Sequence, residues 1–339
     1  MNIVGLSKYS LIVLMGCFTL LLNTPTLEPN AIPRSVYQIA ISGDRRMLAV
    51  MYGTYPYRST VDLFDNTNGQ LLQTLDVAPL AVHEIALSPT GDRLFFASSS
   101  DEGSELNLYD LRTGINVTLW QSNAVGIDRI GWNPANDEIA YVLGSVQILD
   151  AGTGKWIYAI PGLVADLSWS SDGSRLAISD YSPSEPIFGL KEIKNIKVWD
   201  LSTAKRSLTV PMFSLEDQGG GSVALSPDGE RLAFIDDNQL MIYDVNSGHL
   251  EADLPVDTEE LYQVVWNLTG DRLATGGSEL RIWDTSSWEV EKEIKPDGTI
   301  TQLQWSLDGE HVFNDGGADG LYLDDKPVSE LETTEVAVS

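Results

Sequence analysis

The sequence predicts an all-β fold in which seven repeats of four short strands follow one another along the chain. A turn resembling Ser/Asn-Pro-Asp-Gly recurs seven times, each time between two short apolar strands. About 20 residues after each turn a further apolar strand ends in Asp, and these Asp residues stand 40 to 50 residues apart. Because this period is that of one four-stranded blade, we expect a seven-bladed β-propeller. The recurring Asp residues are Asp65, Asp110, Asp150, Asp200, Asp244, Asp284 and Asp324.

We name the strands of each repeat a, b, c and d, and the recurring turn joins a to b. Its clearest copies are Ser88-Pro89-Thr90-Gly91 and Ser226-Pro227-Asp228-Gly229. Proline presets φ for a turn, Ser or Asp caps the local backbone, and glycine takes the left-handed position. The turn is preceded by an alternating strand a, such as 36–41, and followed by strand b, such as 93–97.

Strand c ends in the recurring Asp, as at 61–65 and 281–284. A glycine-containing hairpin turn follows, for example Thr153-Gly154, and strand d comes next, for example at 70–75. Each blade is therefore predicted to be one sheet of four antiparallel strands.

Two copies of strand c end in Trp-Asp, at Trp199-Asp200 and Trp283-Asp284. With the period and the turns, these pairs make residues 36–324 resemble the WD40-repeat family, which implies a propeller fold. The Gly-His pair that opens many repeats of that family is absent, so its network of Asp, His, Ser/Thr and Trp is not expected in most blades. Propellers of the TolB-like type, which have similar turns, are the alternative.

The N-terminal segment 1–33 is predicted to be a signal peptide, or an N-terminal membrane or lipid anchor with its linker. Lys8 precedes fourteen residues, Tyr9 to Leu22, that form an apolar stretch and are followed by polar, proline-bearing sequence. Such a stretch is short for a bilayer span and typical of export. We therefore expect an extracytoplasmic location: periplasm, cell envelope or secreted.

Cys17 is the only cysteine, and Leu14-Met15-Gly16-Cys17 resembles the lipobox of bacterial lipoproteins. That resemblance implies lipidation of Cys17, although the apolar stretch continues past it. Cleavage elsewhere is the alternative.

The propeller itself is expected over 34–327, and 328–339 forms an acidic tail or a closing strand. Strand d of the seventh repeat has two candidate sources in the sequence. Either 332–338 supplies it, or the segment before Ser35 folds back onto the last blade. We favour the N-terminal segment.

The formal net charge of −28, with 49 acidic against 21 basic residues, excludes nucleic acid as a partner. It favours a basic protein surface or an envelope complex. No phosphate loop or metalloprotease motif occurs, so we predict a non-catalytic, monomeric propeller without cofactor or metal. Acidic clusters at 236–237, 315–320 and 324–325 are interpreted as turn residues, and Trp132, Trp169, Trp266 and Trp305 as core packing.

The b–c and d–a loops share one face of a propeller, and the insertions at 52–58, 98–103, 180–195 and 211–221 all fall there. Loops on a rigid scaffold carry binding, so we predict a protein-interaction scaffold acting through this face. The alternatives are a calcium-dependent propeller hydrolase or lactonase, and a sensor of sugars or other small ligands. The candidate partner-binding residues are Tyr55, Tyr57, Arg58, Asp101, Tyr181, Phe188, Met212 and Phe213.

Overall fold

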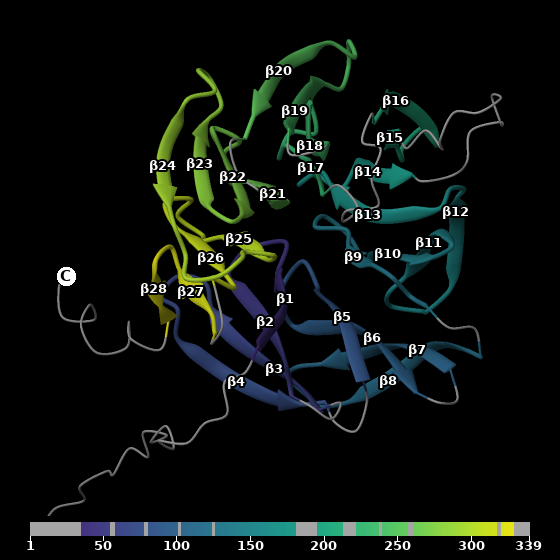
Figure 1. Cartoon of the computed structure of the whole chain (residues 1–339). Coiled ribbons are helices and arrows are strands. Elements are labelled where there is room, and N and C mark those ends of the chain that lie inside the picture. The colour runs from purple at the N-terminus through teal and green to yellow at the C-terminus, as the bar shows by residue number, and fades with distance from the viewer. Residues whose placement is uncertain are drawn as a thin grey trace, which may run out of the picture. The chain divides into compact units, whose positions relative to one another are not determined.

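The computed structural model describes residues 35–54, 58–77, 81–100, 103–123, 126–180, 195–212, 222–236, 239–256, 260–316 and 320–328. All of them belong to one compact unit, Pro33–Ser339. Within these ranges the chain forms seven sheets of four antiparallel strands, and Figure 1 shows them as blades around a common centre. The predicted seven-bladed propeller is confirmed. The described ranges contain no helix that is long and apolar enough to cross a membrane.

Each blade is built from four strands consecutive in the sequence, so the sheets repeat the order a, b, c, d. The a strands are β1 (Ser35–Ile41), β5 (Ala81–Leu87), β9 (Ile130–Trp132), β13 (Val164–Trp169), β17 (Val223–Leu225), β21 (Leu261–Trp266) and β25 (Leu303–Trp305). The b strands are β2 (Met47–Thr54), β6 (Arg93–Ser100), β10 (Glu138–Leu143), β14 (Arg175–Asp180), β18 (Arg231–Asp236), β22 (Arg272–Gly277) and β26 (Val312–Asn314).

The c strands are β3 (Arg58–Asp65), β7 (Gly103–Asp110), β11 (Ser145–Asp150), β15 (Asn195–Asp200), β19 (Gln239–Asp244), β23 (Leu280–Asp284) and β27 (Tyr322–Leu323). The d strands are β4 (Leu71–Asp76), β8 (Asn116–Ser122), β12 (Trp156–Ile160), β16 (Lys205–Pro211), β20 (Leu250–Pro255), β24 (Val290–Ile294) and β28 (Lys326–Pro327). In Figure 1 the a strands lie nearest the centre and the d strands nearest the rim.

The recurring residues build the turns. In the a–b turn of the fifth blade, Ser226 Oγ donates to Asp228 Oδ1 at 2.5 Å and accepts from the Arg231 amide at 2.9 Å. In the c–d turn of the third blade, Asp150 Oδ1 accepts from the amide of Thr153 at 2.7 Å. The same bonds recur in other blades with the equivalent residues. The recurring side chains therefore stabilise the turns of each blade.

The tryptophans that end the a strands pack between blades, as predicted. Trp305 is 1% exposed, and its Nε1 donates to the Val265 carbonyl of the preceding blade at 3.1 Å. Trp266 and Trp169 make the same bond to Ala224 and Gly131, at 3.2 and 3.3 Å. These side chains hold neighbouring sheets together.

The closure of the ring differs from the prediction. The last sheet takes β28 as its fourth strand, so the expectation that the segment before Ser35 supplies it is wrong. Only Asp324 and Asp325 separate β27 from β28, and Asp324 has a φ of 56°, which suits the first position of a two-residue hairpin turn. The segment 332–338 lies outside the described residues.

The first and last blades instead meet through side chains. β1 lies against β25, and Ile39 and Val50 share an apolar cluster with Phe313 and Leu321. Side-by-side packing therefore closes the ring, without a strand exchanged between the first and last sheets of the described chain.

Candidate binding site in the central channel

Seven residues stand at the same register, three positions before the last residue of each a strand, and line a central cavity of about 410 Å³. We call them the polar ring. They are Gln38, Glu84, Arg129, Asp166, Ser222, Gln263 and Gln302. In the third, fifth and seventh blades this position directly precedes strand a. The cavity extends from Tyr37 and Tyr262, where the a strands begin, to Ser42 and Arg45, beyond the end of β1. It is thus a channel along the a strands of the propeller.

Most of the polar ring joins one blade to the next. Gln38 Oε1 accepts from the amide of Ile85 at 2.6 Å, and Asp166 Oδ2 accepts from the amide of Val223 at 3.0 Å. The last blade repeats this across the closure, where Gln302 Oε1 accepts from the amide of Ile39 at 3.5 Å. Ser222 and Gln263 bond to the amides of Val264 and Leu303 in the same way. These hydrogen bonds hold neighbouring a strands together, and a ligand in the channel could bind without breaking them.

The charged part of the ring is one ion-pair network. Arg129 Nη1 donates to Glu84 Oε1 at 2.7 Å, and Arg129 Nε lies 3.6 Å from Asp166 Oδ1. The second oxygen of Glu84 accepts from Gln38 Nε2 at 2.8 Å. Burial raises the pKa of Glu84 to about 7 against the opposing effect of Arg129, and burial also raises the pKa of Asp166. The network places the Glu84 carboxyl group, whose pKa is raised to about 7, inside the channel beside Asp166, whose pKa is also raised.

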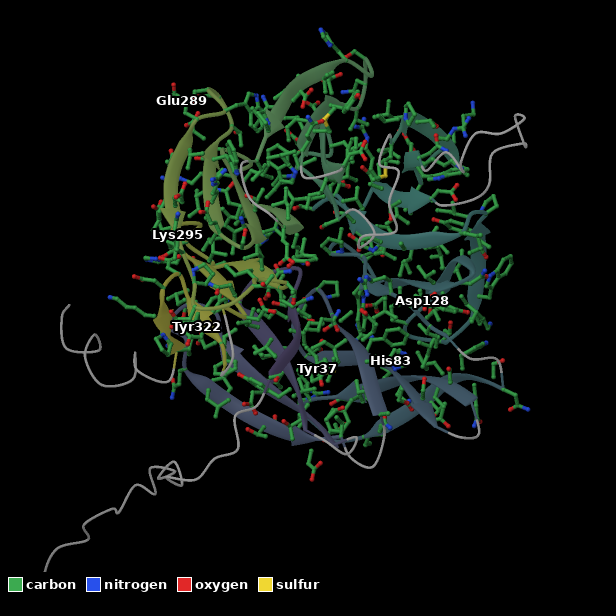
Figure 2. All side chains as sticks on the ribbon, viewed as in Figure 1. Tyr37, His83, Asp128, Glu289, Lys295 and Tyr322 are labelled. Carbon is green, nitrogen blue, oxygen red and sulfur yellow. The ribbon has the colours of Figure 1, made fainter. Side chains whose placement is uncertain are left out.

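The channel end at which the a strands begin is open and aromatic. Tyr37 is 61% exposed and Tyr262 is 40% exposed, and both stand one residue before the polar ring. Leu163, just before β13, is 52% exposed on the same side. Figure 2 labels Tyr37 together with His83 and Asp128, the residues at the matching register of the next two blades. We call this end the open end.

The opposite end of the channel lies at the a–b turns. A second cavity of about 210 Å³ reaches it and is lined by Arg45, Ser168, Ser171, Ser222 and Gln304 among others. The turn of the first blade contacts its neighbours here, because the Asp44 amide donates to the Pro89 carbonyl at 2.8 Å. We call this end the turn end.

The predicted partner-binding residues fall mostly elsewhere. Tyr55, Tyr57, Asp101, Tyr181, Phe188 and Phe213 lie outside the described residues, as does Cys17. Arg58 is the first residue of β3, where it pairs with Thr54.

Met212 was expected to be an exposed anchor, and this is wrong. Its side chain is 5% exposed and packs in a core cluster with Val198, Val223 and Phe234. The residue directly follows β16, so the apolar packing between blades continues one position beyond the strand.

Sequence reasoning missed Tyr37, Tyr262 and Arg45. The two tyrosines lie at β-bulges, where the register shifts between Val36 and Gln38 and between Leu261 and Gln263. Simple alternation along strand a cannot show such a shift. Arg45 carried a readable signal, since it stands where the matching turns of five other blades have glycine.

The acidic clusters act in turns and pairs. Asp324 accepts from His311 Nδ1 at 2.8 Å and Lys292 Nζ at 2.7 Å, and Asp315 accepts from the Thr301 amide at 2.8 Å. Across the described ranges, no group of three or more His, Cys, Asp or Glu side chains is placed to hold a metal ion.

The fold and the site together define a seven-bladed propeller with a polar central channel. No protein-family model matches the chain, and no curated protein matches it significantly.

Proposed function

We propose that this chain is a non-catalytic interaction propeller that binds another protein at the open end of its channel. The observation that carries the proposal is the set of exposed apolar side chains there, Tyr37, Tyr262 and Leu163. Exposed aromatic residues on a rigid scaffold are the usual anchors of protein interfaces. The face is also the one whose loops carry the insertions found in the sequence.

Tyr37 connects this surface to the first insertion. Its ring lies against Gly53, where an added Cβ would come within 2.1 Å of the ring. Gly53 is two residues from Tyr55 in the sequence. We propose that the partner surface also includes Arg58 and, from the loops that lie outside the described residues, Tyr55, Tyr57, Asp101, Tyr181, Phe188 and Phe213.

The proposed partner presents a basic segment. Asp76, Asp128 and Glu260 are exposed at the ends of d strands or the starts of a strands on this face, and the whole chain carries a formal net charge of −28. Such a field speeds the encounter with a basic partner and disfavours acidic ones.

Membership of a WD40-like family and export to the cell envelope are parts of the same proposal. In the sixth blade Trp283 Nε1 donates to Thr275 Oγ1 at 3.1 Å, which is one piece of the family's network of Asp, His, Ser/Thr and Trp. In the fourth blade Ile178 stands at the position of Thr275, and the buried Trp199 Nε1 has no partner among the described residues. The apolar stretch Tyr9 to Leu22, which contains Cys17, supports export with cleavage or lipidation.

The calcium-dependent hydrolase is the weaker candidate for this channel. It needs carboxylates free to bind a cation, whereas Glu84 is bonded to Arg129 and Gln38, and Asp166 to the Val223 amide. Thermal unfolding with calcium and with a chelator tests it, and equal melting temperatures are expected.

Site-specific photocrosslinking tests the proposed function. A photoreactive phenylalanine analogue is placed at Tyr37 or at Trp156, which is equally exposed at 61% but lies on the outer strand β12. In the cells that produce the protein, we expect one abundant adduct from position 37 and none of the same mass from position 156. The same adduct from both positions, or none from position 37, would contradict the proposal.

A further inference from the structure

The a–b turn of the first blade breaks the repeat at one position. Its fourth residue is Arg45, with a φ of 58°. A side chain in this left-handed conformation costs about 1 kcal/mol relative to glycine. Five other blades have glycine there, with φ between 68° and 75°: Gly91, Gly173, Gly229, Gly270 and Gly309.

Among the described residues, Arg45 is also a cation without a partner. Its side chain is largely withdrawn from solvent, and burial lowers its pKa. No described residue accepts a hydrogen bond from its guanidinium or forms an ion pair with it. The other partly buried arginines do have partners: Arg93 pairs with Asp137 and Arg281 with Glu279, among others. A desolvated charge without a counter-ion is costly.

The position of Arg45 places this charge at the turn end of the channel. It lines both the 410 Å³ cavity and the 210 Å³ cavity, together with Ser168, Ser222 and Gln304 from three other blades. Ser168 Oγ accepts from the Leu225 amide at 3.0 Å, and Ser222 Oγ accepts from the Val264 amide at 3.4 Å. Neither hydroxyl donates a hydrogen bond to another described residue, so both hydroxyl hydrogens can be donated to a ligand.

The turn that carries Arg45 is held firmly. Gly43 approaches the third blade so closely that an added Cβ would lie 2.5 Å from the Pro134 carbonyl oxygen. Asp44 Oδ1 accepts from Ser42 Oγ at 2.6 Å and from the Arg46 amide at 3.1 Å. The guanidinium is thus presented from a fixed turn, as a binding site requires.

We propose that the turn end of the channel binds a small oxyanion, a carboxylate or phosphate group, on the guanidinium of Arg45. Arginine suits this role because its planar donors match the oxygens of either group. Ser168, Ser222 and Gln304 supply the polar surroundings. The nearby Asp166 carboxylate is already engaged by Arg129 and the Val223 amide, so it does not neutralise Arg45. The site uses none of the residues of the proposed partner surface.

Anion binding is measured by thermal unfolding and calorimetric titration of the whole propeller, with inorganic phosphate and gluconate as probes. Chloride at the same ionic strength is the reference. We expect at least one probe to raise the melting temperature of the wild-type protein, since a ligand that binds only the folded state stabilises it. Phosphate alone would assign a phosphate ligand, gluconate alone a carboxylate ligand, and both the shared oxyanion chemistry.

Three variants make the test specific. Arg45→Gly restores the residue that the other turns use, so it should fold at least as stably as the wild type, and it should bind the probe at least tenfold more weakly. Arg45→Lys keeps the charge and should bind with intermediate affinity. Arg46→Gly removes a neighbouring exposed arginine and should bind within twofold of the wild type. No shift with either probe, or equal binding by Arg45→Gly, would overturn the proposal.

Discussion

The two ends of the channel are built from the same seven strands and yet present opposite chemistry. At the open end, aromatic side chains at strand bulges are exposed to solvent, as for Tyr37 and Tyr262. At the turn end, Arg45 stands in the a–b turn of the first blade, lines both cavities and has no ion-pair partner among the described residues. Between them the polar ring bonds one blade to the next. The repeated residues therefore determine the propeller fold, whereas the side chains that differ at each end of the channel are single departures from the repeat.

The largest expected effect lies between the two ends, at Glu84. Its pKa in the folded protein is about 7 against an ordinary 4.5, so the folded state holds this proton more tightly than the unfolded state. The resulting stability is fully present below pH 4.5 and is lost as the pH rises through 7, by about 3 kcal/mol. Asp166, with its pKa also raised, acts in the same direction.

Urea unfolding between pH 5 and pH 8 measures this loss, and Glu84→Gln is the control because it does not titrate. The free energy of unfolding should fall much less steeply with pH in the variant than in the wild type. An identical slope in both proteins would show that Glu84 is not the group responsible.

The next effect separates the turn end from the open end. Gly43→Ala would place a Cβ 2.5 Å from the Pro134 carbonyl oxygen and 2.9 Å from the Pro89 Cα, so we expect a loss of about 2 kcal/mol in the free energy of unfolding. Gly152→Ala is the matched control, since its nearest neighbour would be 3.5 Å away. Equal stability of the two variants would mean that the turns at this end are not packed as described.

Arg45→Gly should act in the opposite sense. Without a bound anion, relief of the left-handed backbone and of the unpaired charge should raise the free energy of unfolding by about 1 kcal/mol. Ala204→Gly, at a turn position with a φ of 52°, should gain a similar amount and leave anion binding unchanged. A clear loss of stability in Arg45→Gly would show that the arginine makes a stabilising interaction.

The smallest effect is expected at the open end. The double variant Tyr37→Ala, Tyr262→Ala removes two solvent-exposed side chains, 61% and 40% exposed, so its free energy of unfolding should lie within about 0.5 kcal/mol of the wild type. Its photocrosslinked or co-purified partner should nevertheless be lost. A large drop in stability would assign these tyrosines to the fold instead of to a surface.

Most of the fold could be predicted from the sequence because turn chemistry is local. The Ser226 and Asp150 side chains bond within five residues of themselves, so their recurrence is visible without a structure. The aligned tryptophans were likewise predicted as core, because their position in strand a repeats.

What the sequence could not show depends on contacts between blades. The polar ring is recognised only when the seven a strands are aligned by their register in the structure. The β-bulges in several of these strands hide that alignment in the sequence. Met212 looks exposed in the sequence because nothing local shows the core cluster that covers it. The short strand β28 was missed since two residues, Lys326 and Pro327, carry no strand pattern of their own.

Hydrogen exchange of the wild-type protein with and without the anionic probe tests the separation of the two ends most directly. The account predicts slower exchange of the amides in the turn 42–46 and in β17, and unchanged exchange at 35–38 and 260–262. In Arg45→Gly the probe should slow exchange in none of these segments. Protection at 35–38 and 260–262 instead, or protection of the turn that persists in Arg45→Gly, would contradict it.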